Sequence, residues 1–296
     1  MAEIVTTSIK SLPLVYRGKV RDSYAVGDDK LLIVASDRIS AFDVILGSTI
    51  PGKGIALNLL SNFWFSYTKD IIPNHLLSTS LNDMPSCFSE NAAQYQDRTV
   101  LVKKLKMLPY EFIVRGYLFG NMWEAYKNGV PFCGNKLEGN YEQAERLEAS
   151  IITPSKKASE GHDEYISFEQ LASDIGEDLA KTICQISLQL YKRCYEYAEK
   201  RGIIIADTKF EFGYDESGVL TLGDEIFTPD SSRFWDKSAY HVGESPKSFD
   251  KQFVRDWLIQ EHLNGKEPGP QLPNDIITKT SQLYKDCLDK LLPKSK

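Results

Sequence analysis

The segment Ile203-Ile-Ile-Ala-Asp-Thr-Lys-Phe-Glu-Phe-Gly213 constrains the fold more than any other part of this chain. Strand side chains point alternately to the two faces, so Asp207, Lys209 and Glu211 share one face and the residues between them share the other. Three alternating charges alone are also typical of the exposed face of an edge strand. The run of apolar residues before them instead favours a strand that is buried at its start. The segment therefore predicts a central strand whose charged end faces a cleft.

A second strand follows after turn residues. A turn from Asp215 to Gly218 predicts a hairpin in which Lys209 lies opposite Asp224, and Glu211 lies diagonal to Asp224. Two carboxylates then converge with a lysine between them. This donor set suits Mg²⁺ bound to nucleotide phosphates, because the metal takes one or two carboxylates and completes its shell with water and phosphate oxygens.

A basic hairpin is predicted near the N-terminus. The segment Tyr16-Arg-Gly-Lys-Val-Arg-Asp-Ser-Tyr24 is typical of two strands joined by a glycine turn, with Lys19 and Arg21 projecting on one side. Two cations beside a glycine turn suit the binding of phosphate. The alternative is a simple basic hairpin, since the segment has neither a P-loop nor a dinucleotide-binding glycine motif.

A dense polar set follows the apolar run LLIVA. Asp37, Arg38 and Ser40 stand at the carboxyl end of that predicted strand. A ligand with both amine and carboxylate groups, such as an amino acid, needs such a mixture of charges. A turn held by local hydrogen bonds is the alternative.

Three arginines, Arg115, Arg233 and Arg255, stand next to aromatic or apolar residues, where a guanidinium can bind a carboxylate or phosphate bidentately. Singly, such residues are more often surface ion pairs. The chain, however, is acidic, with 35 Lys and Arg against 41 Asp and Glu and a net charge of −6. Cations that converge in an acidic chain favour a small, strongly anionic substrate, whereas the negative balance argues against a nucleic-acid partner.

The length of 296 residues and the change of pattern near residue 110 predict a β-rich lobe (1–110), an α+β lobe (111–245) and a helical cap (246–296). Periodicity predicts helices over 179–197, 249–261 and 275–292, and a long loop over about 131–161. No apolar stretch reaches the ~18 residues of a membrane span. We therefore expect a cytoplasmic protein without membrane contact, and five reduced cysteines.

Six runs closely resemble, in order and spacing, the SAICAR synthetase (phosphoribosylaminoimidazole-succinocarboxamide synthase) family. They are YRGKVRDSY, ASDRISAFD, LPYEFIVRGYLFG, TPSKKASEGHDEYIS, IIADTKFEFG and LGDEIFTPDSSRFW. The length and the QFVRDWL segment resemble the longer, fungal-type members and not the shorter bacterial ones. The resemblance implies a two-lobed α+β fold, kinase-like or ATP-grasp-like in arrangement. It also implies ATP-dependent ligation, with Mg²⁺, of L-aspartate to carboxyaminoimidazole ribotide (CAIR), which forms SAICAR, ADP and phosphate. We expect a monomer.

The resemblance also implies roles for individual residues. Those implied to bind ATP and its metal are Lys19, Arg21, Glu111, Glu211 and Asp224, with Glu111 beside the adenine. Those implied to act at the ribotide imidazole and its carboxylate are Asp207 and Lys209. Those implied to bind substrate are Arg115 and Arg233, at the ribotide phosphate, and Asp37, Arg38 and Ser40. Arg255 joins the substrate-binding set as a further candidate for anion contact.

The sequence departs from the family pattern in three places. In one of them, Leu137-Glu-Gly-Asn-Tyr141 replaces a GLP-like segment. Gly120 is followed by Asn121 where members commonly have serine, and Lys156 adds a cation to the TPSTKA pattern. We expect the Asn121 amide to donate to the ribotide phosphate instead of the hydroxyl. A small-molecule or protein kinase is one alternative function, but the chain has no HRDxxxxN or DFG sequence. A nucleotide-binding module without catalysis is the other.

Overall fold

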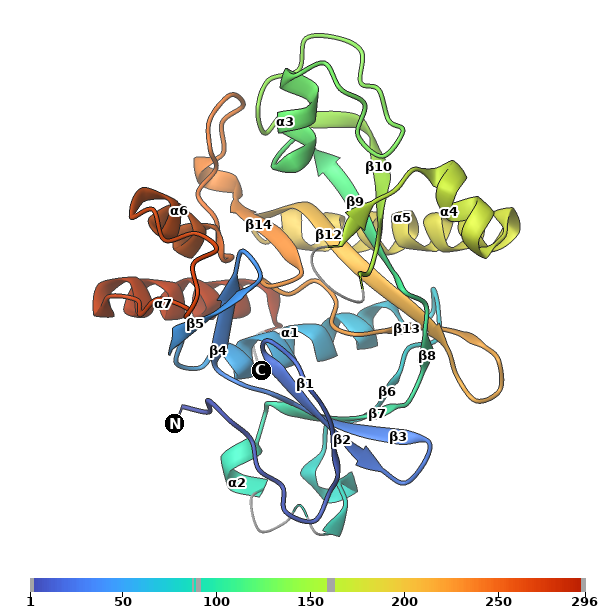
Figure 1. Cartoon of the computed structure of the whole chain (residues 1–296), viewed down its shortest axis with the longest axis vertical. Helices are drawn as coiled ribbons and strands as arrows, with labels where there is room; N and C mark the ends of the chain where they lie inside the picture. Colours follow the sequence, from blue (N-terminus) through green and yellow to red (C-terminus); the bar gives the residue numbers. More distant parts are fainter. Residues whose placement is uncertain (1–2, 87, 89–91, 159–162, 294–296) are drawn as a thin grey trace.

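The computed structural model describes residues 3–86, 88, 92–158 and 163–293. They form an α+β fold with two main antiparallel sheets, as expected (Figure 1). The five-stranded sheet has the order β1 (Leu14–Arg17), β2 (Arg21–Val26), β3 (Lys30–Ala35), β7 (Thr99–Lys103) and β6 (Leu76–Ser78). A separate pair is formed by β4 (Arg38–Ala41) and β5 (Val44–Thr49).

The seven-stranded sheet is built around one long strand, β12 (Ile203–Tyr214). Its other strands are β11 (Glu164–Tyr165), β10 (Arg146–Lys156), β9 (Tyr110–Tyr117), β13 (Leu220–Gly223), β14 (Ser232–Asp236) and β8 (Lys106–Met107). β12 pairs with four of them: β9, β13, β14 and β8. The prediction of a central strand is confirmed, and the edge-strand alternative is wrong.

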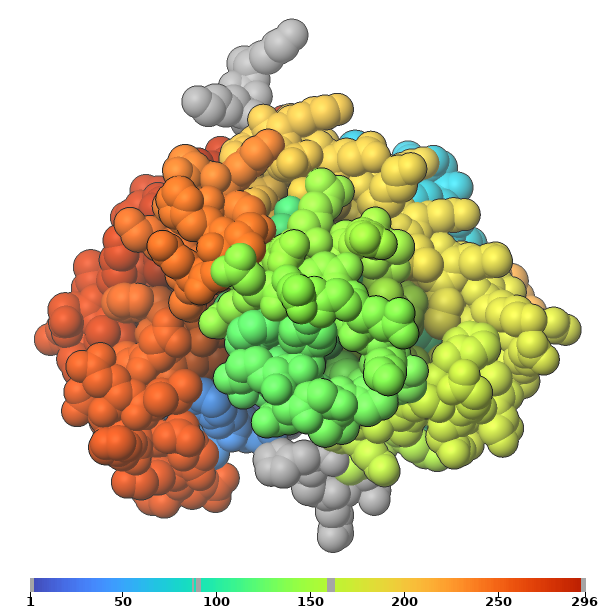
Figure 2. All heavy atoms as spheres, turned by 90° about the horizontal axis from the view of Figure 1, so that it is seen from above, coloured from blue at the N-terminus to red at the C-terminus, as the bar shows by residue number. Residues whose placement is uncertain are grey.

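The helices cover these sheets. They are α1 (Lys53–Thr68), α2 (Ala92–Tyr95), α3 (Asn121–Lys127), α4 (Phe168–Ile175), α5 (Glu177–Glu199), α6 (Gln252–Gln260) and α7 (Asn274–Leu291), with 3₁₀ turns at Leu81–Asp83 and Lys237–Ala239. Figure 1 shows α1 between the two sheets, and α7 packs on α1. Seen from above in Figure 2, the segment around α3 lies between the α4–α5 side and the C-terminal helices. None of the described helices is long and apolar enough to cross a membrane.

Local sequence signals explain the helices. Ser167 caps the N-terminus of α4, because its side-chain oxygen accepts a hydrogen bond from the backbone N–H of Gln170. The apolar face of α5 packs into the main core with the aromatic residues of β12. The predicted C-terminal helices are confirmed as α6 and α7. Four cysteines, Cys133, Cys184, Cys194 and Cys287, are free thiols, whereas Cys87 lies outside the described residues.

The register of the predicted hairpin is wrong by one residue. The turn includes Val219, whose carbonyl accepts a hydrogen bond from Asp215, and β13 begins at Leu220. Glu211 consequently pairs with Gly223, and Asp224 lies just beyond the ladder with a φ of 58°. A left-handed residue ends the regular pairing, so Asp224 reaches the cluster from a turn and not from a strand.

The predicted loop over 131–161 is also wrong in part. Residues 146–156 form β10, which pairs with β9 over most of its length. The strand contains Pro154 and several polar residues, so its own sequence gives no strand periodicity. Its conformation is decided by pairing with β9, which is distant in sequence.

Candidate active site

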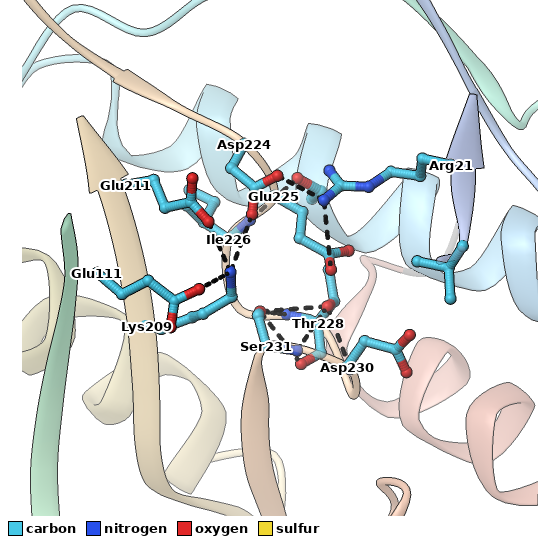
Figure 3. A network of polar contacts seen from close by, with 12 residues as sticks. Arg21, Glu111, Lys209, Glu211, Asp224, Glu225, Ile226, Thr228, Asp230 and Ser231 are labelled. Atoms are coloured by element: carbon cyan, nitrogen blue, oxygen red, sulfur yellow. Dashed lines mark hydrogen bonds and ion pairs between the residues drawn. The ribbon is translucent and has the colours of Figure 1, made fainter. Parts of the chain in front are cut away.

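Three carboxylates surround one ammonium at the ionic face of β12 (Figure 3). The Nζ atom of Lys209 lies 2.8 Å from Glu111 Oε1, 2.7 Å from Glu211 Oε1 and 3.3 Å from Asp224 Oδ2. These carboxylates come from β9, β12 and the turn after β13. The predicted convergence of Glu211 and Asp224 is confirmed despite the shift in register, and Glu111 joins them.

Two further cations complete this carboxylate cluster. Arg21, from β2 of the other sheet, forms an ion pair with Asp224 and lies 3.9 Å from Glu225. Lys157 Nζ lies 2.5 Å from Glu211 Oε2. The cluster therefore bridges the two sheets, and its negative charges are balanced by protein cations.

Burial and charge act against each other on these groups. Burial disfavours the charged ammonium, yet Glu211 and Asp224 raise the pKa of Lys209 well above its usual value. Burial likewise opposes ionisation of Asp224, but Arg21 and Lys209 hold the pKa of that carboxyl well below its usual range. Burial and the neighbouring Asp224 raise the pKa of Glu211. Asp224 is thus the more firmly ionised of the two carboxylates.

An open pocket adjoins the carboxylate cluster. Six residues expected at the active site line it: Arg115, Asn121, Asp207, Lys209, Arg233 and Arg255. The pocket is also lined by Ile113, Tyr165, Thr208, Pro229, Asp230, Ser231, Ser232, Asp250 and Lys251. Cations predominate in this set, so the pocket suits an anionic ligand.

Asp207 holds two of the arginines in place. Its Oδ2 atom lies 3.3 Å from Arg115 Nη1 and also pairs with Arg233 Nη1. Among the described residues, the buried Nε of Arg233 has no hydrogen-bond partner. A Cβ on Gly120, which has a φ of 62°, would lie 2.7 Å from Arg233 Nη2, so glycine makes room for this guanidinium. Because Arg233 has an N–H donor without a partner, it is suited to bind an anion in the pocket.

Sequence reasoning missed Asp230, Asp250 and Lys251. Asp250 accepts hydrogen bonds from the backbone N–H groups of Phe234 and Gln252 at 2.9 and 2.7 Å, and so joins β14 to the start of α6. Burial raises its pKa to about 6. The sequence did contain signals for Asp250 and Lys251. An Asp just before a helix is a common cap, and Lys251 stands four residues before Arg255. That spacing places both cations on one side of α6.

The structure does not bring every expected residue to this pocket. Asp37 is fully buried and accepts hydrogen bonds from the N–H groups of Ile4 and Gly54, both at 2.9 Å, and from Arg98. Arg38 donates to Asp22 Oδ1 at 2.7 Å and to backbone carbonyls. These two lie in a separate buried network near the start of α1. Two more expected residues lie outside both the pocket and the carboxylate cluster: Ser40, in β4, and Lys19, on the basic hairpin, which pairs with Asp43.

Comparison with known proteins points to one family. Residues 14–272 match the family model described as SAICAR synthetase. The phosphoribosylaminoimidazole-succinocarboxamide synthase of Cupriavidus metallidurans is 50% identical over 96% of each chain. The SAICAR-synthase of Saccharomyces cerevisiae, solved in complex with SAICAR, is 44% identical with a TM-score of 0.89 over 98% of each chain. A SAICAR synthetase in complex with ADP is 27% identical, with a TM-score of 0.65 over 86% of this chain and 98% of its own. Both a yeast and a bacterial relative therefore match this chain over nearly their full length.

Proposed function

Because the chain belongs to the SAICAR synthetase family, we propose that the carboxylate cluster and the adjoining pocket divide one ligation reaction between them. The enzyme joins L-aspartate to CAIR at the expense of ATP and forms SAICAR in purine biosynthesis. The position of Lys209 is the observation that supports this division of the site. Its ammonium lies within the carboxylate cluster, and the same residue lines the pocket.

The carboxylate cluster is the ATP end. Lys19 and Arg21 of the basic hairpin would neutralise the phosphates, and Glu111 would lie beside the nucleotide. Glu211 and Asp224 offer the hard oxygen ligands that Mg²⁺ prefers. In the part of the chain that the structure describes, no three acidic, imidazole or thiol groups are arranged to hold a metal by themselves. Two carboxylates completed by water and phosphate oxygens fit Mg²⁺, which when bound would neutralise charge developing on the phosphates.

The adjoining pocket is the ribotide end. Arg115, Arg233 and Arg255 would bind the ribotide phosphate, with Asn121 donating through its amide. Lys251, which sequence reasoning missed, adds a cation to the same wall. Asp207 fixes the first two arginines and faces the space where the imidazole would lie.

The reaction needs positioning and charge neutralisation, with no protein nucleophile. A carboxylate oxygen of the ribotide attacks the γ-phosphorus of ATP, and ADP leaves. The aspartate amine then attacks the acyl carbon of the resulting acyl phosphate, loses a proton, and inorganic phosphate leaves with that oxygen. Lys209 lies where it can neutralise the ribotide carboxylate as it approaches the γ-phosphate.

Oxygen labelling tests this route. Ribotide labelled with ¹⁸O in its carboxylate should yield, on turnover with aspartate, inorganic phosphate that carries one ¹⁸O. The reaction is kept short, and the label in unreacted ribotide is measured alongside, because CAIR loses CO₂. Unlabelled phosphate would exclude carboxylate activation. A stable phosphorylated acceptor without amide product would favour the kinase alternative. Absence of ADP formation would favour the non-catalytic module.

We also propose the three-part division 1–110, 111–245 and 246–296. The sheets support the first boundary to within a few residues: β7, the last strand of the first sheet in sequence, ends at Lys103, and β8, at Lys106–Met107, already pairs with β12 of the second. A monomer in the cytoplasm that acts on small molecules and binds no nucleic acid completes the proposal. The net charge of −6 supports the last point. Sedimentation equilibrium of the purified chain tests the oligomeric state.

A further inference from the structure

Asp230 anchors one wall of the pocket. It lies in a run of five consecutive lining residues, 229–233, that ends in Arg233, and residues 230–233 of this run are called the 230–233 wall. Its side chain is 4% exposed. The carboxylate is held from three directions: Oδ1 accepts a hydrogen bond from Tyr284 Oη at 2.6 Å, and Oδ2 lies 2.7 Å from Lys53 Nζ and 3.9 Å from Lys251 Nζ. This wall is therefore tied to distant parts of the chain.

Two of these partners do not themselves line the pocket. Lys53 is the first residue of α1 and is fully buried, and Tyr284 is buried in α7. The Lys53 ammonium also lies 5.8 Å from the centre of the Tyr284 ring. Burying an ammonium, a carboxylate and a phenol contributes little net stability compared with apolar side chains of similar size. What the arrangement does specify is the position of the Asp230 carboxylate.

The third partner faces the ligand space. Lys251 lines the pocket, and Asp230 is the carboxylate with which it pairs in the described residues. Burial lowers the pKa of Lys251, and the Asp230 carboxylate opposes that effect. A displaced Asp230 would therefore alter both the position and the charge of a cation in the pocket.

We propose that Tyr284 and Lys53 are positioning residues, which fix the Asp230 carboxylate and through it place Lys251 and the 230–233 wall for ribotide binding. The inference rests on the proposed assignment of this pocket to the ribotide. It extends the active site to two residues that contact no substrate.

Tyr284→Phe tests the inference because it keeps the ring and removes only the hydroxyl. The KM for ribotide should rise roughly three- to tenfold, as expected for one lost hydrogen bond, while kcat and the KM for ATP change less than about twofold. Tyr197→Phe is the matched control, since the Tyr197 hydroxyl also bonds to α7, at the Leu291 carbonyl, 3.0 Å away. An equal rise in the control would reduce Tyr284 to a structural role and overturn the inference.

A double-mutant cycle shows whether Tyr284 acts through Asp230. Asp230→Asn should raise the ribotide KM at least as much as Tyr284→Phe, and the second substitution should add nothing in the Asp230→Asn background. The same fold-change in both backgrounds would overturn the inference. Asp230→Asn alone serves as the second variant if Tyr284→Phe does not fold, and an unchanged ribotide KM there has the same meaning.

Arg233→Ala distinguishes a failure of the pocket assignment from a failure of the role inferred for Tyr284. If it raises the ribotide KM and Tyr284→Phe does not, the pocket assignment stands and only this inference fails. If Arg233→Ala leaves the ribotide KM unchanged, the pocket assignment fails, and the inference that rests on it fails as well.

Discussion

The Lys209 ammonium lies 2.8 Å from the Glu111 carboxylate, although the residues are 98 positions apart in the sequence. Lys209 pairs with Ile113 across β9 and β12, so Glu111 is its diagonal neighbour on the same face. The same ammonium also contacts Glu211 and Asp224. A protein cation thus stands at the centre of the carboxylates proposed to bind magnesium.

Lys209→Met should therefore strengthen the binding of Mn²⁺ to the nucleotide-free enzyme by about tenfold or more, because the metal no longer meets a positive charge among the carboxylates. Turnover should be lost. Titration followed by electron paramagnetic resonance measures the Mn²⁺ affinity without any need for activity. Lys103→Met is the control and should change nothing, since Lys103 ends β7 and pairs with Asp215 in the turn of the β12–β13 hairpin. Unchanged or weaker binding in Lys209→Met would contradict the metal assignment.

Glu211→Gln and Asp224→Asn should each lower turnover at least a hundredfold, on the order of 3 kcal/mol of transition-state stabilisation, because each removes one charged oxygen ligand. Thermal unfolding should show folded proteins. Glu216→Gln, in the exposed turn of the same hairpin, should have normal activity. Near-normal activity of both cluster variants at saturating Mg²⁺ is incompatible with the assignment.

Arg233→Ala and Arg115→Ala should raise the KM for ribotide by about ten- to a hundredfold, since a lost charged hydrogen bond is worth roughly 1.5–3 kcal/mol. The KM for aspartate should change much less. Arg193→Ala, which removes only the exposed ion pair with Asp70, serves as the control in the same steady-state assay. The assignment fails if the aspartate KM rises and the ribotide KM does not.

His75 should make the protein less stable in mild acid. Burial lowers its pKa to about 4, whereas the unfolded chain has an ordinary value of about 6.5. As pH falls from about 6.5 to about 4, the unfolded state therefore binds a proton that the folded state does not, and stability is lost. Between pH 7.5 and 5 the loss from this residue is about 2 kcal/mol.

Urea unfolding at pH 7.5 and pH 5 measures this effect. His75→Gln should lose about 2 kcal/mol less than the parent protein between the two pH values. The raised pKa of Asp250 acts in the opposite direction, but it is present in both proteins and cancels in the comparison. His241→Gln, at an exposed histidine, should behave as the parent. Equal losses in the parent and in His75→Gln would refute the prediction.

The strand that carries the chemistry could be predicted because its pattern is local. Alternation along β12 places Lys209 and Glu211 on one face, and the structure agrees. The register of its hairpin could not be predicted to the residue, since the extra turn residue Val219 depends on two hydrogen bonds that composition does not reveal. Its carbonyl accepts from the Asp215 N–H, and its N–H donates to Asp215 Oδ1. The carboxylates nevertheless converge, because long side chains tolerate a shift of one residue.

Contacts between distant segments could not be predicted from the sequence. β10 is a strand because β9 lies beside it, and its proline and polar residues conceal this. No sequence feature distinguishes Lys53 from any other lysine at a helix start, and only the fold places it against Asp230. Asp37, by contrast, stands in a polar segment of the kind that binds ligands. In the fold its carboxylate instead accepts hydrogen bonds from backbone N–H groups.

The burial of β12 determines how the molecule should exchange its amide hydrogens. Residues 203–208 of this strand are buried and it is paired on both sides, so its amides should exchange only through global unfolding. β1, exposed along its whole length at the edge of the other sheet, should exchange first. Substrate turnover therefore proceeds on a slowly exchanging strand, whereas β1, in the hairpin that carries Lys19 and Arg21, should open early among the described strands.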